Sequence, residues 1–189
     1  MSRSVFDRYF AYSGASVAIR AHASSSCDPS RVSARTGMRR PSSRACHVLK
    51  ESICRLCVAD HRNDPAILTA WLANKTPEMV ATWATQKGNS LLLAVEGDAV
   101  AAVGSVTDAG EITLNYVAPN ARFRGISRAL LKALEARAIE RGNSRCTLTS
   151  TETAHRFYLS AGYCDNGTPT GKFGTRAGYP MSKEIVTSR

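Results

Sequence analysis

The chain has 189 residues, of which 43% are hydrophobic, and a formal net charge of +10. This length is enough for one domain with a core of its own and a short appendage. The sequence holds no run of 18 or more apolar residues, so it offers no membrane-spanning helix. We also predict no nucleic-acid partner, because the basic residues form no basic helix and no patch interleaved with aromatic residues.

The N-terminal segment differs in composition from the rest of the chain. Residues 1–40 hold seven Arg against two Asp, and so carry half of the net charge, without sustained hydrophobic periodicity. We predict that residues 1–37 lie outside the domain, as a disordered tail, a targeting segment or an extension from an early start codon. The domain would then cover residues 38–189, with Met38 as a candidate start.

Six cysteines lie at irregular positions in the chain. A chain of this length needs no disulfides to fold, so we predict reduced thiols and an intracellular, cytoplasmic protein. Cys54 and Cys57, with His61 nearby, could form part of a metal site. However, structural zinc usually has four protein ligands, and no second pair of cysteines is present. We therefore predict no bound metal.

Three helices are predicted after the N-terminal segment. Residues 43–59 carry apolar side chains at helical spacing. Asp64 is a favourable N-cap for a second helix that begins with Pro65. Thr76 is a favourable N-cap for a third helix that ends near Gln86.

Three consecutive antiparallel strands are predicted next. Residues 90–95 and 99–106 are mostly apolar, and Gly97 between them indicates a hairpin turn. Residues 111–117 alternate between apolar and polar side chains. The rest of the chain predicts a strand at 146–150, a helix at 153–161 that ends at Gly162, a glycine-rich loop at 167–178 and a last strand at 179–186.

A basic loop separates the strand at 111–117 from a helix predicted at residues 126–138. Gly125 lets the loop backbone approach a ligand closely, and Ser127 is the predicted N-cap of the helix. The first N–H groups of a helix have no partner within the helix. Beside Arg122 and Arg124, these groups predict a site for an anion.

This loop carries a resemblance to a known family. Residues 117–131 read Val-Ala-Pro-Asn-Ala-Arg-Phe-Arg-Gly-Ile-Ser-Arg-Ala-Leu-Leu. The segment resembles the acetyl-CoA-binding motif of the GCN5-related N-acetyltransferases, the GNAT superfamily, whose pattern is Gln/Arg-x-x-Gly-x-Gly/Ala. Here the pattern falls on Arg122, Gly125 and Ser127, and the serine departs from it. Residues 154–163 resemble the family's second pattern, Ala-x-x-Phe-Tyr-x-x-x-Gly-Phe/Tyr.

The resemblance implies a fold and a cofactor. The fold is α+β, with a mixed, mostly antiparallel sheet flanked by helices over about residues 38–186, and with its first strand poorly represented. The co-substrate is acetyl-CoA, and backbone N–H groups near Val117 would polarise its acetyl oxygen. The residues expected to bind the cofactor are Tyr116, Val117, Arg122, Phe123, Arg124, Gly125, Ile126, Ser127, Arg128, Thr153 and Phe157.

The same resemblance implies catalytic roles for two residues. In related enzymes the tyrosine of the second segment lies near the thioester sulfur, so Tyr158 is the expected acid, with aromatic packing as the alternative. In some relatives the base is a glutamate that lies as far before the cofactor loop as Glu111 lies before Arg122. Glu111 is therefore the expected base, and the alternative is that it is a solvated turn residue without a catalytic role. The family builds its acceptor pocket near Trp71, Trp83 and residues 74–76, although core packing explains both tryptophans equally well.

We therefore predict an N-acetyltransferase that moves an acetyl group directly from acetyl-CoA to a primary amine within a ternary complex. The acceptor would be a small molecule or an amino-acid-like compound, and the protein a monomer or homodimer without a membrane partner. Two alternatives remain open. One is a protein or peptide N-acetyltransferase, and the other is an acyl-CoA-binding sensor without turnover, which the departure at Ser127 favours.

Overall fold

The computed structural model describes residues 8–12, 15–21, 41–171, 174–175 and 178–185. In this part of the chain the strands form one eight-stranded sheet in the order β1-β2-β3-β4-β5-β6-β8-β7. The strands are β1 (Arg8–Tyr12), β2 (Ala15–Ala21), β3 (Asn89–Glu96), β4 (Ala99–Thr107), β5 (Glu111–Val117), β6 (Arg145–Thr151), β7 (Cys164–Asp165) and β8 (Gly178–Glu184). The helices are α1 (Pro41–Leu56), α2 (Val58–His61), α3 (Pro65–Leu72), α4 (Pro77–Thr85), α5 (Ile126–Glu140) and α6 (Glu152–Ser160), with a short 3-10 helix η2 (Pro119–Ala121).

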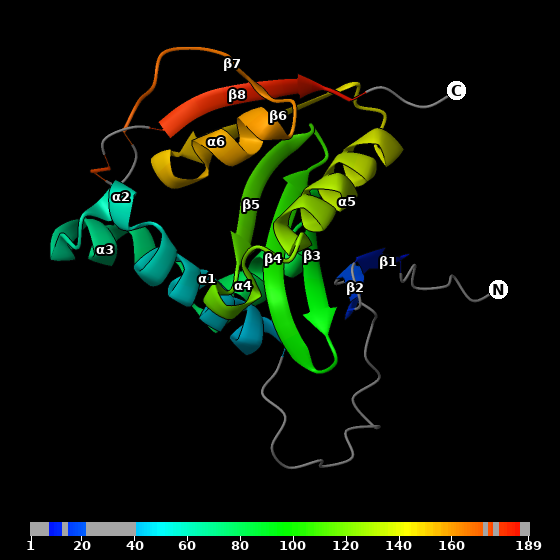
Figure 1. Cartoon of the computed structure of the whole chain (residues 1–189), viewed down its shortest axis with the longest axis horizontal. Helices are drawn as coiled ribbons and strands as arrows, with labels where there is room; N and C mark the ends of the chain where they lie inside the picture. The colour runs from blue at the N-terminus through cyan, green and yellow to red at the C-terminus, as the bar shows by residue number, and fades with distance from the viewer. Residues whose placement is uncertain (1–7, 13–14, 22–40, 172–173, 176–177, 186–189) are drawn as a thin grey trace.

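The predicted α+β fold is confirmed, since helices flank a mixed and mostly antiparallel sheet. Figure 1 shows α1 to α4 grouped beside one end of the central strands, and α6 with β8 at the other end. The predicted N-caps of α3 and α4 are present. The Asp64 carboxylate accepts from the Ala66 N–H at 2.8 Å, and the Thr76 hydroxyl accepts from the Met79 N–H at 3.2 Å. These local signals fix where the helices begin because each side chain satisfies a free N–H group.

The predicted helix at residues 43–59 is divided in the structure. Helix α1 ends at Leu56 and α2 begins at Val58, with the buried Cys57 between them. The two-residue strand β7 was not predicted. It pairs with β8, where Cys164 lies opposite Ser182.

Two strands lie within residues 1–37, the segment predicted as an extension. Strand β2 pairs antiparallel with β3, and β1 pairs with β2. Ile19 on β2 is buried, with 4% of its surface exposed. In the structure these two segments are strands of the sheet, with β1 at its edge and β2 between β1 and β3. The rest of residues 1–37 lies outside the described residues.

Helices cover both faces of the sheet, as neighbouring residues of β4 show. A Cβ added at Gly104 would come within 2.9 Å of the Leu134 side chain, so α5 packs directly on the backbone there. The next residue, Ser105, donates from its hydroxyl to the Asn89 side-chain oxygen at 2.7 Å, and the Asn89 side-chain amide donates to the Trp83 backbone carbonyl on α4 at 2.8 Å. Successive side chains of a strand point to opposite faces, so α5 and α4 lie on opposite sides.

Strands β5 and β6 separate along their length. They are parallel neighbours, but only two residue pairs are in register, Glu111 with Thr147 and Ile112 with Leu148. Beyond these pairs each strand continues without the other, β5 to Val117 and β6 to Thr151. The opening between them removes backbone pairing from the middle of the sheet and leaves room for a ligand.

Two further findings concern membrane-spanning helices and the state of the cysteines. Among the described residues, no helix combines the length and the apolar character needed to cross a membrane. The five cysteines in this part of the chain (46, 54, 57, 146 and 164) are all free thiols, and Cys27 lies outside it.

Candidate active site

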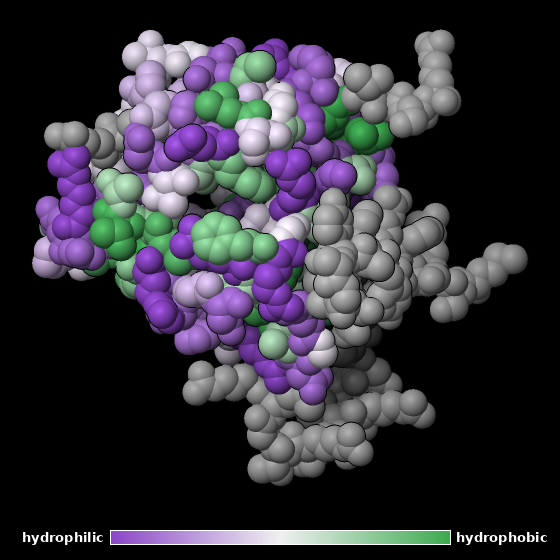
Figure 2. Space-filling view, in the orientation of Figure 1, coloured by the Kyte–Doolittle hydropathy of each residue, from purple (hydrophilic) through white to green (hydrophobic). Residues whose placement is uncertain are grey.

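A cavity of about 540 Å³ lies where β5 and β6 separate. Its walls come from β5, β6, α1, α6 and the loop that leads into α5. Figure 2 shows this face of the molecule hollowed between the positions that α6 and α1 occupy in Figure 1. The expected cofactor residues that line this cavity are Tyr116, Val117, Arg122, Phe123, Gly125, Ile126, Ser127, Arg128, Thr153 and Phe157.

The loop backbone delivers the start of α5 to this cavity. Gly125 has φ +75°, which a residue with a side chain rarely adopts, and it is the N-cap of a helix that begins at Ile126. The predicted N-cap Ser127 is wrong, because Ser127 lies inside the first turn. No side chain caps the helix, so its first N–H groups stay available at the positive end of the helix dipole. This start of α5 can bind an anion such as a phosphate.

Phe123, two residues before Gly125, combines a left-handed backbone with an exposed aromatic ring. Phe123 has φ +59° and 93% of its surface is exposed. The guanidinium of Arg122 lies 4.5 Å from the centre of the Phe123 ring. A left-handed backbone costs a residue with a side chain roughly 1–3 kcal/mol, and such strain often occurs at ligand-binding loops.

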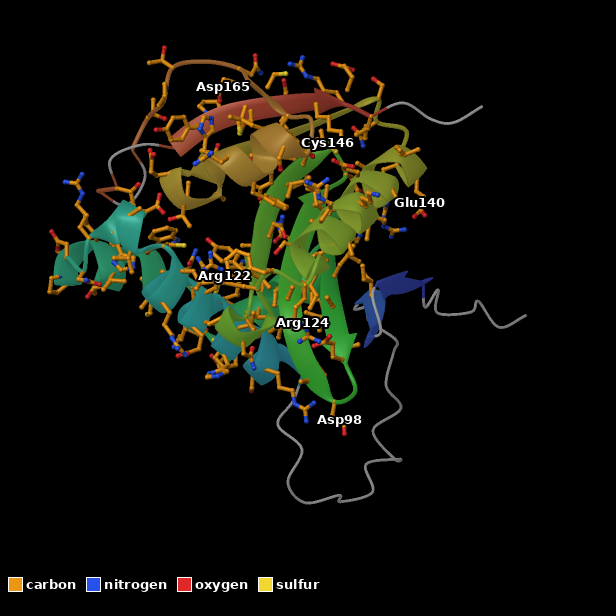
Figure 3. All side chains as sticks on the ribbon, viewed as in Figure 1. Asp98, Arg122, Arg124, Glu140, Cys146 and Asp165 are labelled. Carbon is orange, nitrogen blue, oxygen red and sulfur yellow. The ribbon has the colours of Figure 1, made fainter. Side chains whose placement is uncertain are left out.

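The two loop arginines point to different places. Figure 3 shows Arg122 on the side of α1, whereas Arg124 lies toward the hairpin of β3 and β4. The Arg124 guanidinium makes two bonds to the Glu96 carboxylate, at 2.6 and 2.9 Å, and its side chain does not line the cavity. The Arg124 side chain thus pairs with Glu96 in this structure, and its expected contact with the cofactor stays a prediction.

The side chains of two more expected cofactor residues, Arg128 and Thr153, also make hydrogen bonds to other residues of the protein. Arg128 lines the cavity and donates to the Ser160 hydroxyl at 3.2 Å, which links α5 to α6. The Thr153 hydroxyl donates to the Asp60 carboxylate at 2.6 Å, and that carboxylate also accepts from the Glu152 N–H at 2.7 Å. Asp60 thus stabilises the start of α6 from α2, although it lies about 90 residues away in the sequence.

Tyr158 lines the cavity and is buried, with 7% of its surface exposed. Burial raises the pKa of its phenol to about 12, and a hydrogen bond from the Asn115 side chain partly opposes this rise. The ring packs edge-on against Phe157, with 5.1 Å between the ring centres. Tyr158 therefore keeps its proton at neutral pH and presents a hydrogen-bond donor within the site.

Two residues of β5 contribute in ways that sequence reasoning missed. The Asn115 carbonyl oxygen is buried and has no hydrogen-bond partner among the described residues, and Asn115 lines the cavity. Tyr116 was expected as a cofactor contact, but its phenol also accepts a hydrogen bond from the Trp71 indole, and its pKa is raised mainly by burial. Alternation along β5 shows which face each residue occupies, but the partners come from α3 and α6.

A second cavity, of about 440 Å³, adjoins the first. Trp71, Trp83 and Lys75 line it, together with Glu111, which does not line the first cavity. The predicted base and the predicted acid thus lie in different cavities. The residues shared by the two walls are Ile112, Thr113, Leu114, Tyr116, Thr149, Ser150 and Thr151, all from the region where β5 and β6 separate.

The possible metal ligands do not come together. His61 is buried, and its Nδ1 accepts from the Asn63 N–H at 3.0 Å while its Nε2 lies 3.1 Å from the Ile53 carbonyl. Both ring nitrogens are therefore used by the backbone. Burial also raises the pKa of the Cys57 thiol to about 12, which disfavours the thiolate that binds metals. In the described part of the chain, no three His, Cys, Asp or Glu residues are grouped to hold a metal ion.

Comparison with known proteins agrees with this geometry. The family model described as an acetyltransferase (GNAT) domain matches residues 52–185. No curated protein matches the chain. One similar solved structure is a GCN5-related N-acetyltransferase from Rhodopseudomonas palustris, with 20% identity and a TM-score of 0.72 over 93% of this chain and 99% of that one. Because residues 1–37 make up about a fifth of the chain, that match extends into them.

Two further solved structures share the fold at lower similarity. The PaiA N-acetyltransferase from Thermoplasma acidophilum, in complex with coenzyme A, has 15% identity and a TM-score of 0.64 over 76% of this chain and 92% of that one. An aminoglycoside 6'-acetyltransferase type Ii has 18% identity and a TM-score of 0.53 over 77% of this chain and 96% of that one. At these identities the likeness shows the fold alone.

Proposed function

Because the chain belongs to the GNAT acetyltransferase family, we propose that it transfers an acetyl group from acetyl-CoA to a primary amine. The acceptor is a small molecule, and the transfer is direct, with both substrates bound at once. The observation that supports this most strongly is the pair of cavities that share one wall between β5 and β6. Two substrates held in these cavities would meet at that wall, where β5 and β6 do not pair beyond Ile112 and Leu148.

The residues of the first cavity fit the cofactor. The uncapped start of α5 and the Arg122 guanidinium supply N–H groups for the pyrophosphate. The backbone N–H groups of β5 near Val117 would donate to the acetyl oxygen, as the family resemblance implies. When bound, acetyl-CoA supplies the activated thioester. Ser127 fits despite its hydroxymethyl group, because it lines the cavity and can itself donate to a phosphate oxygen.

Tyr158 acts on the leaving sulfur in this proposal. As the amine nitrogen bonds to the acetyl carbon, the carbon–sulfur bond breaks and negative charge develops on sulfur. A thiol has a pKa of about 8.5, so a phenol with a pKa of about 12 holds its proton more tightly than the thiol would. Tyr158 therefore stabilises the developing thiolate by donating a hydrogen bond, and the proton that the thiol finally keeps comes from the amine.

Glu111 is the proposed base. It lines the second cavity, which would hold the acceptor, and it is exposed at the start of β5. From there its carboxylate can accept the proton that the ammonium form of the acceptor must lose, directly or through water. The neutral amine then has the lone pair that the reaction needs.

A thiol-release assay tests the proposed function. The purified chain is mixed with acetyl-CoA and a panel of small primary amines, and mass spectrometry identifies the acetylated product. We expect release of CoA that depends on a small amine. Turnover with peptides alone would identify a peptide N-acetyltransferase, and acetyl-CoA binding without turnover by any amine would identify a sensor; either result would contradict the proposal.

A further inference from the structure

The second cavity contains a lysine that is buried. Only 5% of the Lys75 surface is exposed. Its backbone is held on both sides, because its N–H donates to the Leu72 carbonyl at 2.9 Å and its carbonyl accepts from the Cys46 thiol at 3.0 Å. The chain is thus fixed at this position, between α3 and α4, with the lysine in the wall of the cavity.

The ammonium group of Lys75 has no carboxylate partner among the described residues. Its hydrogen bond goes to the side-chain oxygen of Asn74, and it lies 5.5 Å from the centre of the Trp83 ring. Burial lowers the pKa of the Lys75 ammonium from its ordinary value, because its charged form has lost contact with water. A buried charge costs free energy unless it is paired, so an anion that enters the cavity would find a strong partner here.

Among the described residues that line this cavity, one other is charged, and its charge is of opposite sign. Glu111 and Lys75 are the two charged residues in that set, and the remainder are polar or apolar. The indole groups of Trp71 and Trp83 supply apolar walls. A cavity of about 440 Å³ falls in the range of about 300–1,000 Å³ that small-molecule sites occupy.

We propose that the acceptor is a compact amine that carries a carboxylate, as a free amino acid does, and that Lys75 binds this carboxylate. Its amino group then lies toward the wall that the two cavities share. This inference rests on the proposed function, because it identifies the class of acceptor for the same reaction. It disfavours the N-terminus of a peptide, where the neighbouring carboxylate is replaced by a neutral amide.

Matched substrate pairs test the proposal. Glycine, leucine and phenylalanine are each compared with their carboxamides in the thiol-release assay, on the full chain. We expect kcat/KM to be at least about tenfold higher for the acids, which corresponds to about 1.4 kcal/mol. The amine of a carboxamide is less basic and more often neutral, so its ionisation would favour the opposite order. Equal or better turnover of all three carboxamides would overturn the inference while leaving the acetyltransferase proposal in place.

The variant Lys75→Met separates binding from folding. Methionine keeps an unbranched side chain without the charge, so kcat/KM for the acids should fall at least about tenfold, with less than a twofold change for the carboxamides. Lys87→Met, at an exposed lysine outside both cavities, is the matched control and should change neither. An equal loss for both members of each pair would mean that Lys75 only stabilises the fold, and would contradict the inference.

A binding measurement on the unaltered protein needs neither turnover nor a variant. Calorimetry compares N-acetyl-L-phenylalanine with N-acetyl-L-phenylalaninamide in the presence of CoA. Tighter binding of the acid supports the carboxylate site even if no amine is turned over, in which case the acetyltransferase proposal alone would fail. Equal binding of the two compounds would overturn the carboxylate site.

Discussion

The two cavities share a wall but are built from different kinds of group. The first is shaped largely by one continuous segment, in which β5, the loop at Arg122 and the start of α5 present backbone N–H groups. The second collects side chains from α3, α4, β3, β4, β5 and β6, and among the described residues its charged groups are Lys75 and Glu111. A site made of backbone suits a cofactor shared by a whole family. A site made of scattered side chains can change its specificity without changing the fold.

The largest expected effect is in the first cavity, which Tyr158 lines. Tyr158→Phe keeps the ring and removes the donor that stabilises the developing thiolate, so kcat should fall about a hundredfold with little change in KM. Steady-state kinetics with a saturating acceptor measure both. Tyr163→Phe, which removes a hydroxyl outside both cavities, is the control. Full activity of Tyr158→Phe would mean that the tyrosine only packs.

Glu111→Gln tests the proposed base in the second cavity. We expect kcat/KM to fall at least about tenfold and the acidic limb of the pH–rate profile to disappear. Glutamine has the size of glutamate but lacks the carboxylate that accepts the proton. Glu51→Gln, at a half-buried glutamate on α1 that lines neither cavity and pairs with Arg55 at 3.3 Å, should leave the profile unchanged. If the limb survives in Glu111→Gln, ionisation of the amine itself is the titrating event.

Gly125→Val tests the backbone site. Valine strongly disfavours φ +75°, so the loop must shift and the start of α5 moves away from the cofactor. The affinity for acetyl-CoA should fall about tenfold in calorimetry, about 1.4 kcal/mol. Gly142→Val is a matched control, since Gly142 also has positive φ, at +85°, and open space around it. Equal affinities for the two variants would contradict the anion site.

The two arginines of the loop provide a finer test. Arg122→Gln should lower the affinity for acetyl-CoA about fivefold, because a charge-assisted bond to phosphate is lost. Arg124→Gln should change it less than about twofold, since that side chain pairs with Glu96 and an exposed pair contributes little. A larger loss for Arg124→Gln would show that Arg124 leaves Glu96 when the cofactor binds.

The smallest effect on either cavity is expected from the N-terminal segment. A variant that starts at Met38 loses β2, which exposes the edge of β3 and removes the buried Ile19. Burial of such a side chain contributes about 1.5–3 kcal/mol, so the melting temperature should fall by about 5 °C. Affinity for acetyl-CoA should stay within about twofold. An unchanged melting temperature would support the prediction that residues 1–37 are dispensable for the domain.

The sequence predicted those parts of the fold whose signals are local. The caps Asp64 and Thr76 act on N–H groups two or three residues away, and both lie where the sequence placed them. The alternation in β5 and the spacing in α5 likewise depend on neighbours along the chain. The N-cap at Ser127 was misplaced by two residues, because Gly125 adopts a left-handed backbone that ends the loop earlier.

The strands at residues 8–12 and 15–21 show a limit of local patterns. Their composition resembles that of a tail, and what makes β2 a strand is pairing with β3, more than 70 residues further along the chain. The sequence of such a short segment does not by itself predict the pairing, since strand preference depends on the neighbouring strands.

By itself, the sequence determined most of the helices and strands after residue 60, the basic loop before α5 and the resemblance that the family match bears out, because each depends on residues close together in the chain. The tertiary structure decided which groups meet. It joined Asp60 to the start of α6, assigned Arg124 to Glu96 and placed Lys75 in a cavity without a carboxylate partner among the described residues. These contacts depend on how distant segments pack, and the identity of a side chain does not reveal whether its charge is paired, solvated or left for a ligand.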